Sequence, residues 1–263
     1  MTIDVAKWGL RRLLPSDGMV HEPPSPHATV GIIKDWITRF PADTGIQTNG
    51  FGNSFEDERI AWGAERLGGI AATDVLELGP FEGAQTYLLE RAGAHVTAIE
   101  ANKRNYLKCL ITKEVMGMRN ARFLLGNFLP WLETSNHRFD VIWASGVLYH
   151  MTEPLRLLRA IAAHTDKVFI WTHYFPEGGN PRRPPFFRRR SVHFADREIS
   201  HFDRLYLRPR WRSLACGGTA AGSCWLRRDD ILFALQALGF SKIEVGLEDH
   251  KPYRDSFSLA AQR

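Results

Sequence analysis

The stretch that most constrains this chain runs from residue 74 to 102 and reads as a strand, a glycine turn, a helix and a second strand. Short apolar runs at 75–78 and 96–99 are typical of parallel strands that are buried on both faces. Gly79 and Gly83 bracket the turn, where the backbone must bend sharply and can approach a ligand closely. The pattern predicts half of a nucleotide-binding α/β unit, and the ligand of that unit decides the function.

The spacing of the turn favours a ligand without a phosphate. A dinucleotide-binding turn carries G-x-G-x-x-G and places its phosphates at the N-terminus of the helix. This chain has E-L-G-P-F-E-G instead, with Pro80 and Phe81 inside the turn. A negative charge on Glu82 would repel a pyrophosphate in a poorly screened site. The alternative for this stretch is an ordinary strand–helix–strand crossover whose glycines only make the turn.

The E-x-G-x-x-x-G turn, with Glu100 closing the next strand, resembles motifs I and II of the class I S-adenosylmethionine (SAM) methyltransferases. The resemblance implies that Glu77 and the turn at 79–83 hold the methionine end of SAM, and that Glu100 accepts both ribose hydroxyls. The segments N-Y-L-K-C-L at 105–110 and G-V-L-Y-H at 146–150 are similar to a subset that includes the tRNA wobble-uridine carboxymethyltransferases. We interpret that similarity as kinship of the cofactor-binding half, without a shared substrate.

The remaining pattern predicts an α/β fold with a seven-stranded Rossmann-like sheet. The expected strands lie at 75–78, 96–99, 121–125, 139–144, 167–172, 241–247 and 256–261. Five alternating strand–helix units indicate parallel strands with right-handed crossovers. The short link before the last strand suits a hairpin, so that strand should be antiparallel. The resemblance implies the strand order 3-2-1-4-5-7-6, with helices on both faces.

The two segments outside this sheet are expected to cover the site. Residues 1–54 are predicted to form a helical and loop cap, with helices at 2–14 and 30–40. Residues 55–263 would form the methyltransferase domain. Within that domain, 175–225 is expected to be an irregular insert that serves as a substrate lid.

Ligands of open α/β sheets bind at the carboxyl ends of the strands, which places the candidate site residues. The candidate cofactor contacts are Glu77, Gly79, Pro80, Phe81, Gly83, Glu100, Ala101, Asn127, Phe128, Ser145 and Tyr149. By the resemblance, Asn127 meets the amino group of adenine, and an amide carries both a donor and an acceptor. Phe128 either stacks on the ring or belongs to the core. Tyr149 either packs on the cofactor or holds the substrate.

His150 is the first candidate for the chemistry because it follows the fourth strand. An imidazole with an unperturbed pKa of about 6.5 suits a proton acceptor. The alternative is a histidine that caps a loop or packs under the sheet. His173 and Tyr174, at the end of the fifth strand, are second candidates. A metal held by His150 and His173 would need a third ligand that the sequence does not supply, so we predict no metal site.

The basic charge of the chain is concentrated in one segment. The formal net charge is +5, but residues 182–212 hold ten arginines against three acidic residues. Such a segment could read phosphates or grip a carboxylate or anionic sugar, or it could be a solvated or oligomer-interface loop. Because its aromatic residues suit a lid, we predict a small-molecule or glycan acceptor first. An RNA-modifying methyl- or carboxymethyltransferase is second, and a non-catalytic SAM-binding protein is third.

Composition indicates the compartment. Three cysteines form no disulfide framework, which fits a reducing cytoplasm. No apolar run approaches the roughly 20 residues of a membrane-spanning helix, so no membrane partner is expected. No feature of the sequence indicates an oligomeric state.

Overall fold

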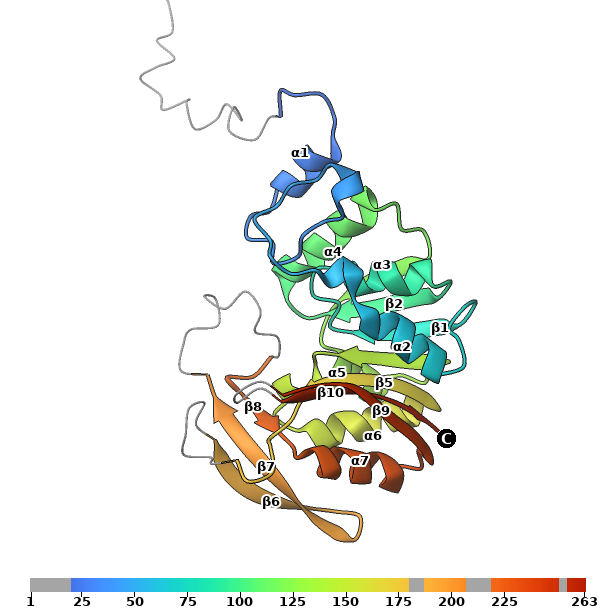
Figure 1. Cartoon of the computed structure of the whole chain (residues 1–263), viewed down its shortest axis with the longest axis vertical. Helices are drawn as coiled ribbons and strands as arrows, with labels where there is room; N and C mark the ends of the chain where they lie inside the picture. The colour runs from blue at the N-terminus through green and yellow to red at the C-terminus, as the bar shows by residue number, and fades with distance from the viewer. Residues whose placement is uncertain (1–19, 180–186, 207–218, 251–254) are drawn as a thin grey trace, which may run out of the picture.

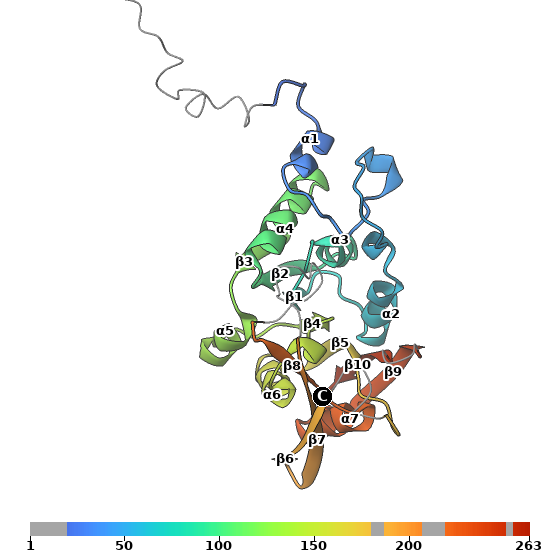
Figure 2. The same cartoon turned by 90° about the vertical axis from the view of Figure 1, so that its left-hand side faces the viewer.

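A computed structural model describes residues 20–179, 187–206, 219–250 and 255–263. A large sheet with helices on both faces forms the centre, and a smaller sheet lies at one end (Figures 1 and 2). The strands of the large sheet are β1 (Asp74–Leu78), β2 (His95–Glu100), β3 (Ala121–Leu125), β4 (Val141–Ser145), β5 (Lys167–His173), β9 (Lys242–Asp249) and β10 (Ser256–Gln262). The helices are α1 (Pro26–Gly31), α2 (Glu58–Arg66), α3 (Ala84–Arg91), α4 (Lys103–Val115), α5 (Phe128–Thr134), α6 (Pro154–His164) and α7 (Arg228–Ala237). Short 3-10 turns lie at Ala42–Thr44, Ser54–Glu56 and Leu148–His150.

The large sheet confirms the predicted topology. Its order is β3-β2-β1-β4-β5-β10-β9, which is 3-2-1-4-5-7-6 when only its own strands are counted. β1 pairs in parallel with β2 and with β4, whereas β10 is antiparallel to both β5 and β9. The order reverses at β1, so the carboxyl ends of β1 and β4 flank the point where such sheets bind ligands.

Each face of the sheet carries its own hydrophobic core. One core lies between the sheet and helices α5, α6 and α7, and the other lies against α2, α3 and α4. On the second face, Trp143 and Phe169 are fully buried and stack with ring centroids 3.9 Å apart. A Cβ atom on Gly63 of α2 would lie 2.5 Å from Phe169 and 2.6 Å from Trp143. The glycine therefore lets α2 approach these two rings closely.

The prediction that 175–225 is irregular is wrong for the described part of the insert. Three antiparallel strands form a second sheet in the order β6-β7-β8: β6 (Arg188–Phe194), β7 (Arg197–Leu205) and β8 (Gly222–Trp225). The run of arginines conceals the strand pattern because the first residues of β6 are exposed on both faces, so apolar and polar residues do not alternate there. Phe194 and Ile199 are buried in the same core as α6 and α7, which fixes the small sheet to the domain.

The helix predicted at 30–40 is also wrong. Helix α1 ends at Gly31, and the chain then continues without regular helix to residue 53, apart from the 3-10 turn at Ala42–Thr44. The backbone N–H groups of Ile37 and Thr38 donate to the carboxylate of Glu82 instead of to helix carbonyls. Apolar residues of this segment pack on α3 and α4. Their spacing along the sequence resembles that of a helix, but the segment that buries them is irregular. The helix predicted at 2–14 lies outside the described residues.

A buried ion pair joins this segment to the centre of the fold. Glu82 and Lys108 are 2.6 Å apart, and their side chains are 0% and 2% exposed. Lys108 also donates to the carbonyl oxygen of Asp35 at 2.6 Å. The N–H groups of Ile37 and Thr38 complete the shell of the carboxylate, at 3.1 and 2.7 Å. Both charges are therefore hydrogen-bonded, as buried charges must be to be tolerated.

Among the described helices, none combines the length and apolar character that a membrane crossing requires.

We expect Lys108→Met to lower the free energy of unfolding by about 3–5 kcal/mol, because it leaves the buried Glu82 carboxylate uncompensated. Urea unfolding followed by circular dichroism measures the change. Lys103→Met, at the exposed start of the same helix, is the control and should shift the value by less than about 0.5 kcal/mol. Equal stabilities of the two variants would contradict this role of the pair.

Candidate active site

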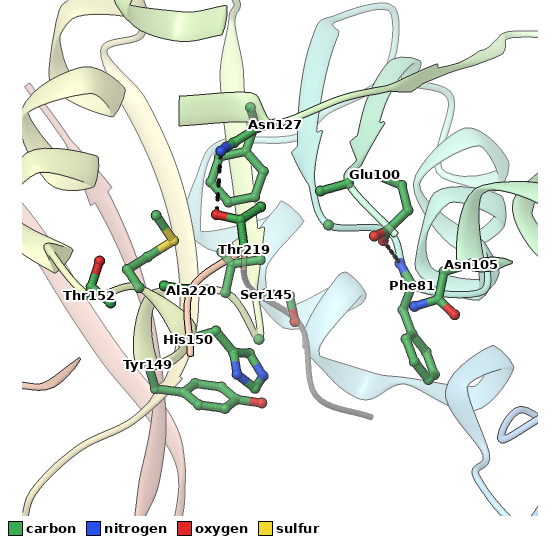
Figure 3. A pocket seen from close by; sticks show the side chains of 16 residues that line it. Phe81, Glu100, Asn105, Asn127, Ser145, Tyr149, His150, Thr152, Thr219 and Ala220 are labelled. Atoms are coloured by element: carbon green, nitrogen blue, oxygen red, sulfur yellow. Dashed lines mark hydrogen bonds between the residues drawn. The ribbon is translucent and has the colours of Figure 1, made fainter. Parts of the chain in front are cut away.

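A cavity of about 270 Å³ opens at the carboxyl ends of β1, β2 and β4 (Figure 3). The strand ends and the turns that follow them form most of its wall, and the segment leading into β8 closes the other side. Nine of the predicted site residues line it: Gly79, Phe81, Glu100, Ala101, Asn127, Phe128, Ser145, Tyr149 and His150. The other five, Glu77, Pro80, Gly83, His173 and Tyr174, lie outside its lining.

The glycine turn after β1 has the sharp bend that the sequence predicts. Gly79 adopts φ 66°, and a Cβ atom there would lie 2.8 Å from Val147 across the cavity wall. Phe81 also lies in the left-handed region, at φ 59°. Such a conformation costs a non-glycine residue on the order of 1–3 kcal/mol and persists only where its surroundings enforce it. The hydrogen bond from the Phe81 N–H to Glu100, at 3.1 Å, is one such restraint.

Glu100 ends β2 and holds the turn from the neighbouring strand. Its two carboxylate oxygens accept the N–H of Phe81 at 3.1 Å and the N–H of Asn102 at 2.7 Å. Burial raises the pKa of Glu100, and these backbone hydrogen bonds oppose the shift by favouring the charged form. Figure 3 shows the carboxylate on the wall opposite His150.

Glu77 does not reach the cavity, contrary to the expectation from the motif. Its side chain is buried on β1 and accepts a hydrogen bond from the hydroxyl of Thr86 on α3. Burial raises the pKa of Glu77 to about 8; the Thr86 bond lowers it, and the charge of Glu100 raises it further. Glu77 therefore stabilises the turn from the side that faces away from the cavity.

Pro80 and Gly83, like Glu77, lie outside the cavity lining. Pro80 is buried, and Gly83 adopts φ 84° at the start of α3. A Cβ atom on Gly83 would lie 3.4 Å from the backbone of Cys109 and 3.5 Å from Thr112. This half of the turn packs on α4, so only the half around Gly79 and Phe81 borders the cavity.

The argument from Glu82 against a phosphate ligand is wrong. The carboxylate points into the protein and is paired with Lys108, so it presents no uncompensated charge to the cavity. What separates this turn from a dinucleotide site is its glycine spacing alone.

Tyr149 and His150 lie together on the 3-10 turn that follows β4. Their ring centroids are 4.2 Å apart, and His150 Nδ1 lies 3.2 Å from the hydroxyl oxygen of Tyr206, just beyond β7. Tyr149 also contacts the ring of His173, at 4.7 Å between centroids. His173 in turn stacks on Trp225 at 5.4 Å. His173 therefore lies behind Tyr149, one ring away from the cavity.

Tyr174 is a core residue. Side chains alternate between the two faces along a strand, so the residue after His173 points the other way. The Tyr174 ring is buried and meets Phe257 edge-on at 5.4 Å. Its burial raises the pKa of the phenol. The geometry does not bring Tyr174 to the site.

Seven further residues line the cavity that were not predicted: Asn105, Gly146, Val147, Met151, Thr152, Thr219 and Ala220. Asn105 lies in the first turn of α4, and its proximity to Glu100 in sequence was a usable signal. Thr219 and Ala220 come from the insert, far along the chain, and no local pattern marks them. Thr219 Oγ1 lies 3.5 Å from the amide nitrogen of Asn127, so the insert meets the strand ends directly.

Comparison with known proteins identifies the fold. A family model described as a methyltransferase domain matches residues 76–167, from β1 to the start of β5. The N-terminal domain of EvdMO1, solved in the presence of SAH and D-fucose, has a TM-score of 0.69 at 24% identity, covering 90% of this chain and 94% of that one. In whole EvdMO1 the match covers 49% of that chain, with a TM-score of 0.59 at 21% identity and 92% of this chain covered.

Two further solved structures share the arrangement. Magnesium protoporphyrin IX methyltransferase from Synechocystis PCC 6803, with bound SAH, has a TM-score of 0.54 at 16% identity, covering 79% of this chain and 81% of that one. The 1,6-didemethyltoxoflavin-N1-methyltransferase of Burkholderia thailandensis has a TM-score of 0.52 at 15% identity, with coverages of 80% and 78%. A search of curated proteins found no match. The fold is therefore that of the class I SAM-dependent methyltransferases.

The raised pKa of Glu77 predicts a pH-dependent stability. The folded state keeps this proton up to a pH of about 8, whereas the unfolded chain releases it near the ordinary value of 4.5. Between these values the folded state binds more protons, so the free energy of unfolding should fall as pH rises, by up to about 1.4 kcal/mol per pH unit. Glu77→Gln should remove this contribution, which urea titrations at several pH values will measure.

The exposed Glu65→Gln is the matched control and should keep the slope of the wild type. Glu100 contributes in the same direction in every variant, so the quantity compared is the difference between each variant and the wild type. A Glu77→Gln slope equal to that of the wild type would show that Glu77 ionises normally in the fold.

Proposed function

We propose that this protein transfers the methyl group of SAM to a small-molecule or glycan acceptor. The observation that carries the proposal is the position of the cavity. It lies at the switch point of a class I methyltransferase sheet, between Glu100 on one wall and His150 on the other. The methyltransferase-domain match covers the strands that build both walls.

The residues of the cavity fit SAM. Each oxygen of the Glu100 carboxylate accepts a backbone N–H and retains lone-pair capacity for a ribose hydroxyl. The oxygen of the Asn127 side chain caps α5 through the N–H of Leu129, while the amide nitrogen lies on the cavity side near Thr219. Asn127 would therefore donate to a ring nitrogen of adenine, rather than accept from its amino group. The side chains of Phe128 and Met151 provide an apolar part of the cavity wall.

The chain would contribute position and proton removal to the reaction. SAM, when bound, supplies an electrophilic methyl carbon on a sulfonium. The turn at Gly79 and the Glu100 carboxylate would orient the cofactor, and such positioning accounts for much of the rate of a two-substrate reaction. His150 borders the cavity and would accept the proton of an acceptor hydroxyl or amine.

Four of the described arginines in the basic segment contact neighbouring side chains, which favours a small acceptor over RNA. Arg190 pairs with Asp203 at 2.8 Å, and Arg197 pairs with Asp230 at 3.5 Å. Arg189 donates to Ser200 at 3.0 Å, and Arg204 lies over the ring of Trp225 at 5.9 Å. These side chains stabilise the small sheet and its attachment to α7. RNA modification, including the carboxymethyl transfer suggested by the G-V-L-Y-H segment, is the second candidate and rests on the net charge of 182–212.

We expect Glu100→Ala to raise the dissociation constant for SAH at least tenfold, because it removes charged hydrogen bonds worth about 1.5–3 kcal/mol each. Isothermal titration calorimetry measures the affinity, and circular dichroism verifies the fold. Glu65→Ala, on an exposed face of α2, is the control. Binding of NAD instead of SAH would overturn the assignment.

We expect His150→Ala to lower kcat about 10²- to 10⁴-fold with an unchanged affinity for SAH, as removal of a general base does. The assay is SAH release with a panel of free sugars, beginning with D-fucose, and other small metabolites. His193→Ala, on the exposed face of β6, is the matched control. Full activity in His150→Ala would remove the base from the proposal. SAH binding without turnover on any acceptor would favour the non-catalytic alternative.

Substrate class is tested by salt. A phosphate-reading surface should bind tRNA with an affinity that falls steeply between about 50 and 200 mM salt, whereas turnover of a small acceptor should change little. Methylation of tRNA with such a salt dependence would favour the second candidate over the first.

A further inference from the structure

We infer that Tyr206 is a positioning residue for His150 and that it sets which ring nitrogen of the imidazole carries the proton. The hydroxyl oxygen of Tyr206 lies 3.2 Å from His150 Nδ1. A base that acts through Nε2 has its lone pair there, so the proton of the neutral ring is on Nδ1 and the Tyr206 oxygen accepts it. The inference rests on the proposed function for the role of His150 as a base.

The two side chains are held by separate parts of the fold. His150 ends the 3-10 turn after β4, and its backbone N–H donates to the carbonyl of Val147 at 3.0 Å. Tyr206 follows β7 directly, and its backbone N–H donates to the carbonyl of Ala221 at 3.2 Å. This hydrogen bond holds the Tyr206 backbone in place against the segment that leads into β8.

The small sheet is also hydrogen-bonded to the turn that carries His150. The N–H of Cys224 on β8 donates to the carbonyl of Met151, the residue after His150, at 2.6 Å. Arg204, also on β7, lies over the Tyr206 ring at 5.7 Å. The position of the Tyr206 hydroxyl relative to the imidazole thus follows from the docking of one sheet on the other.

The role of His150 as a base through Nε2 determines the direction of the hydrogen bond. A tyrosine hydroxyl can donate or accept, but a neutral imidazole has one N–H and one lone pair. A base acting through Nε2 needs its lone pair there, so the proton must be on Nδ1 and the tyrosine oxygen must accept it. The hydrogen bond made by one ring nitrogen fixes the tautomer of the other.

The reaction step then balances. His150 Nε2 takes the proton of the acceptor hydroxyl or amine, whose electron pair forms the new bond to the methyl carbon. The carbon–sulfur bond breaks and its electrons stay on sulfur, which leaves neutral SAH. The imidazolium keeps its Nδ1–H towards Tyr206 and later releases the Nε2 proton to water. Tyr206 stays neutral throughout, so it orients the ring without supplying a countercharge.

Nuclear magnetic resonance of protein labelled with ¹⁵N-histidine tests the tautomer without an acceptor. At alkaline pH, where the ring is neutral, long-range ¹H–¹⁵N spectra distinguish the two tautomers. The His150 signals are assigned by their loss in His150→Gln. We expect the Nδ1–H form in the wild type and a shift towards the Nε2–H form in Tyr206→Phe. Tyr87→Phe, which removes the hydroxyl of a tyrosine on α3 that packs on Phe55, is the control and should leave the signals unchanged.

Kinetics give the second measurement. On an acceptor that the wild type methylates, Tyr206→Phe should lower kcat about three- to tenfold, the rate equivalent of one neutral hydrogen bond. The KM for the acceptor and the affinity for SAH should not change. An Nε2–H tautomer in the wild type, or identical signals in Tyr206→Phe and the wild type, would overturn the inference. Absence of SAH binding would overturn the proposed function instead, and calorimetry reads that result separately from the tautomer.

Discussion

The buried pair of Glu82 and Lys108 is the interaction on which the geometry of the site depends. It lies at the glycine turn and ties three distant pieces of chain together: the turn, helix α4 and the segment around Asp35 to Thr38. Two charges with side chains 2% exposed or less must be desolvated, which is costly. The backbone groups of the N-terminal segment offset that cost by completing the shells of both side chains. The segment therefore follows a hydrogen-bonding requirement rather than a helical period.

From that anchor the restraints continue to the cavity. With one half of the turn packed on α4, the other half places Phe81 in a left-handed conformation whose N–H meets Glu100. Glu100 lies on the neighbouring strand, so this wall of the cavity combines the ends of β1 and β2 with the turn that follows β1. Glu77 supports the same turn from beneath, buried and with its pKa raised. Glu77, Glu82 and Glu100 are all buried, so their different roles follow from their different hydrogen-bond partners.

The opposite wall is built between two sheets. The 3-10 turn carrying Tyr149 and His150 belongs to the large sheet, whereas Tyr206, Thr219 and Ala220 come from the insert. A hydrogen bond from the Cys224 N–H of β8 to the carbonyl of Met151, which directly follows the turn, joins the two. The described part of the insert, which was predicted to be a lid, forms a sheet and a following segment that complete the cavity wall and contact the candidate base.

The family resemblance supplied the strand order, and local pattern was sufficient for the strands, the glycine turn and the candidate residues at strand ends. These features depend on buried apolar runs and on the rule that parallel strands bring their carboxyl ends together, both of which can be read along the chain. The pattern was insufficient where the same sequence feature is compatible with more than one structural role. It predicted a helix at 30–40, cofactor contact for Glu77 and a catalytic place for Tyr174, because helical spacing, motif position and sequence adjacency do not specify which neighbour a side chain meets.

By itself, then, the sequence determined a class I methyltransferase sheet, through the family resemblance, and the edge of the sheet at which the cavity lies. Only the tertiary structure decided that Glu82 faces inward to Lys108, that the described part of the arginine-rich insert forms a sheet, and that Tyr206 reaches His150 from 56 residues along the chain. The physical reason is the distance along the sequence over which each kind of interaction acts. Strand and turn formation depends on neighbours within a few residues, whereas the partner of a buried charge or a ring nitrogen is selected by the packing of elements that are remote in sequence.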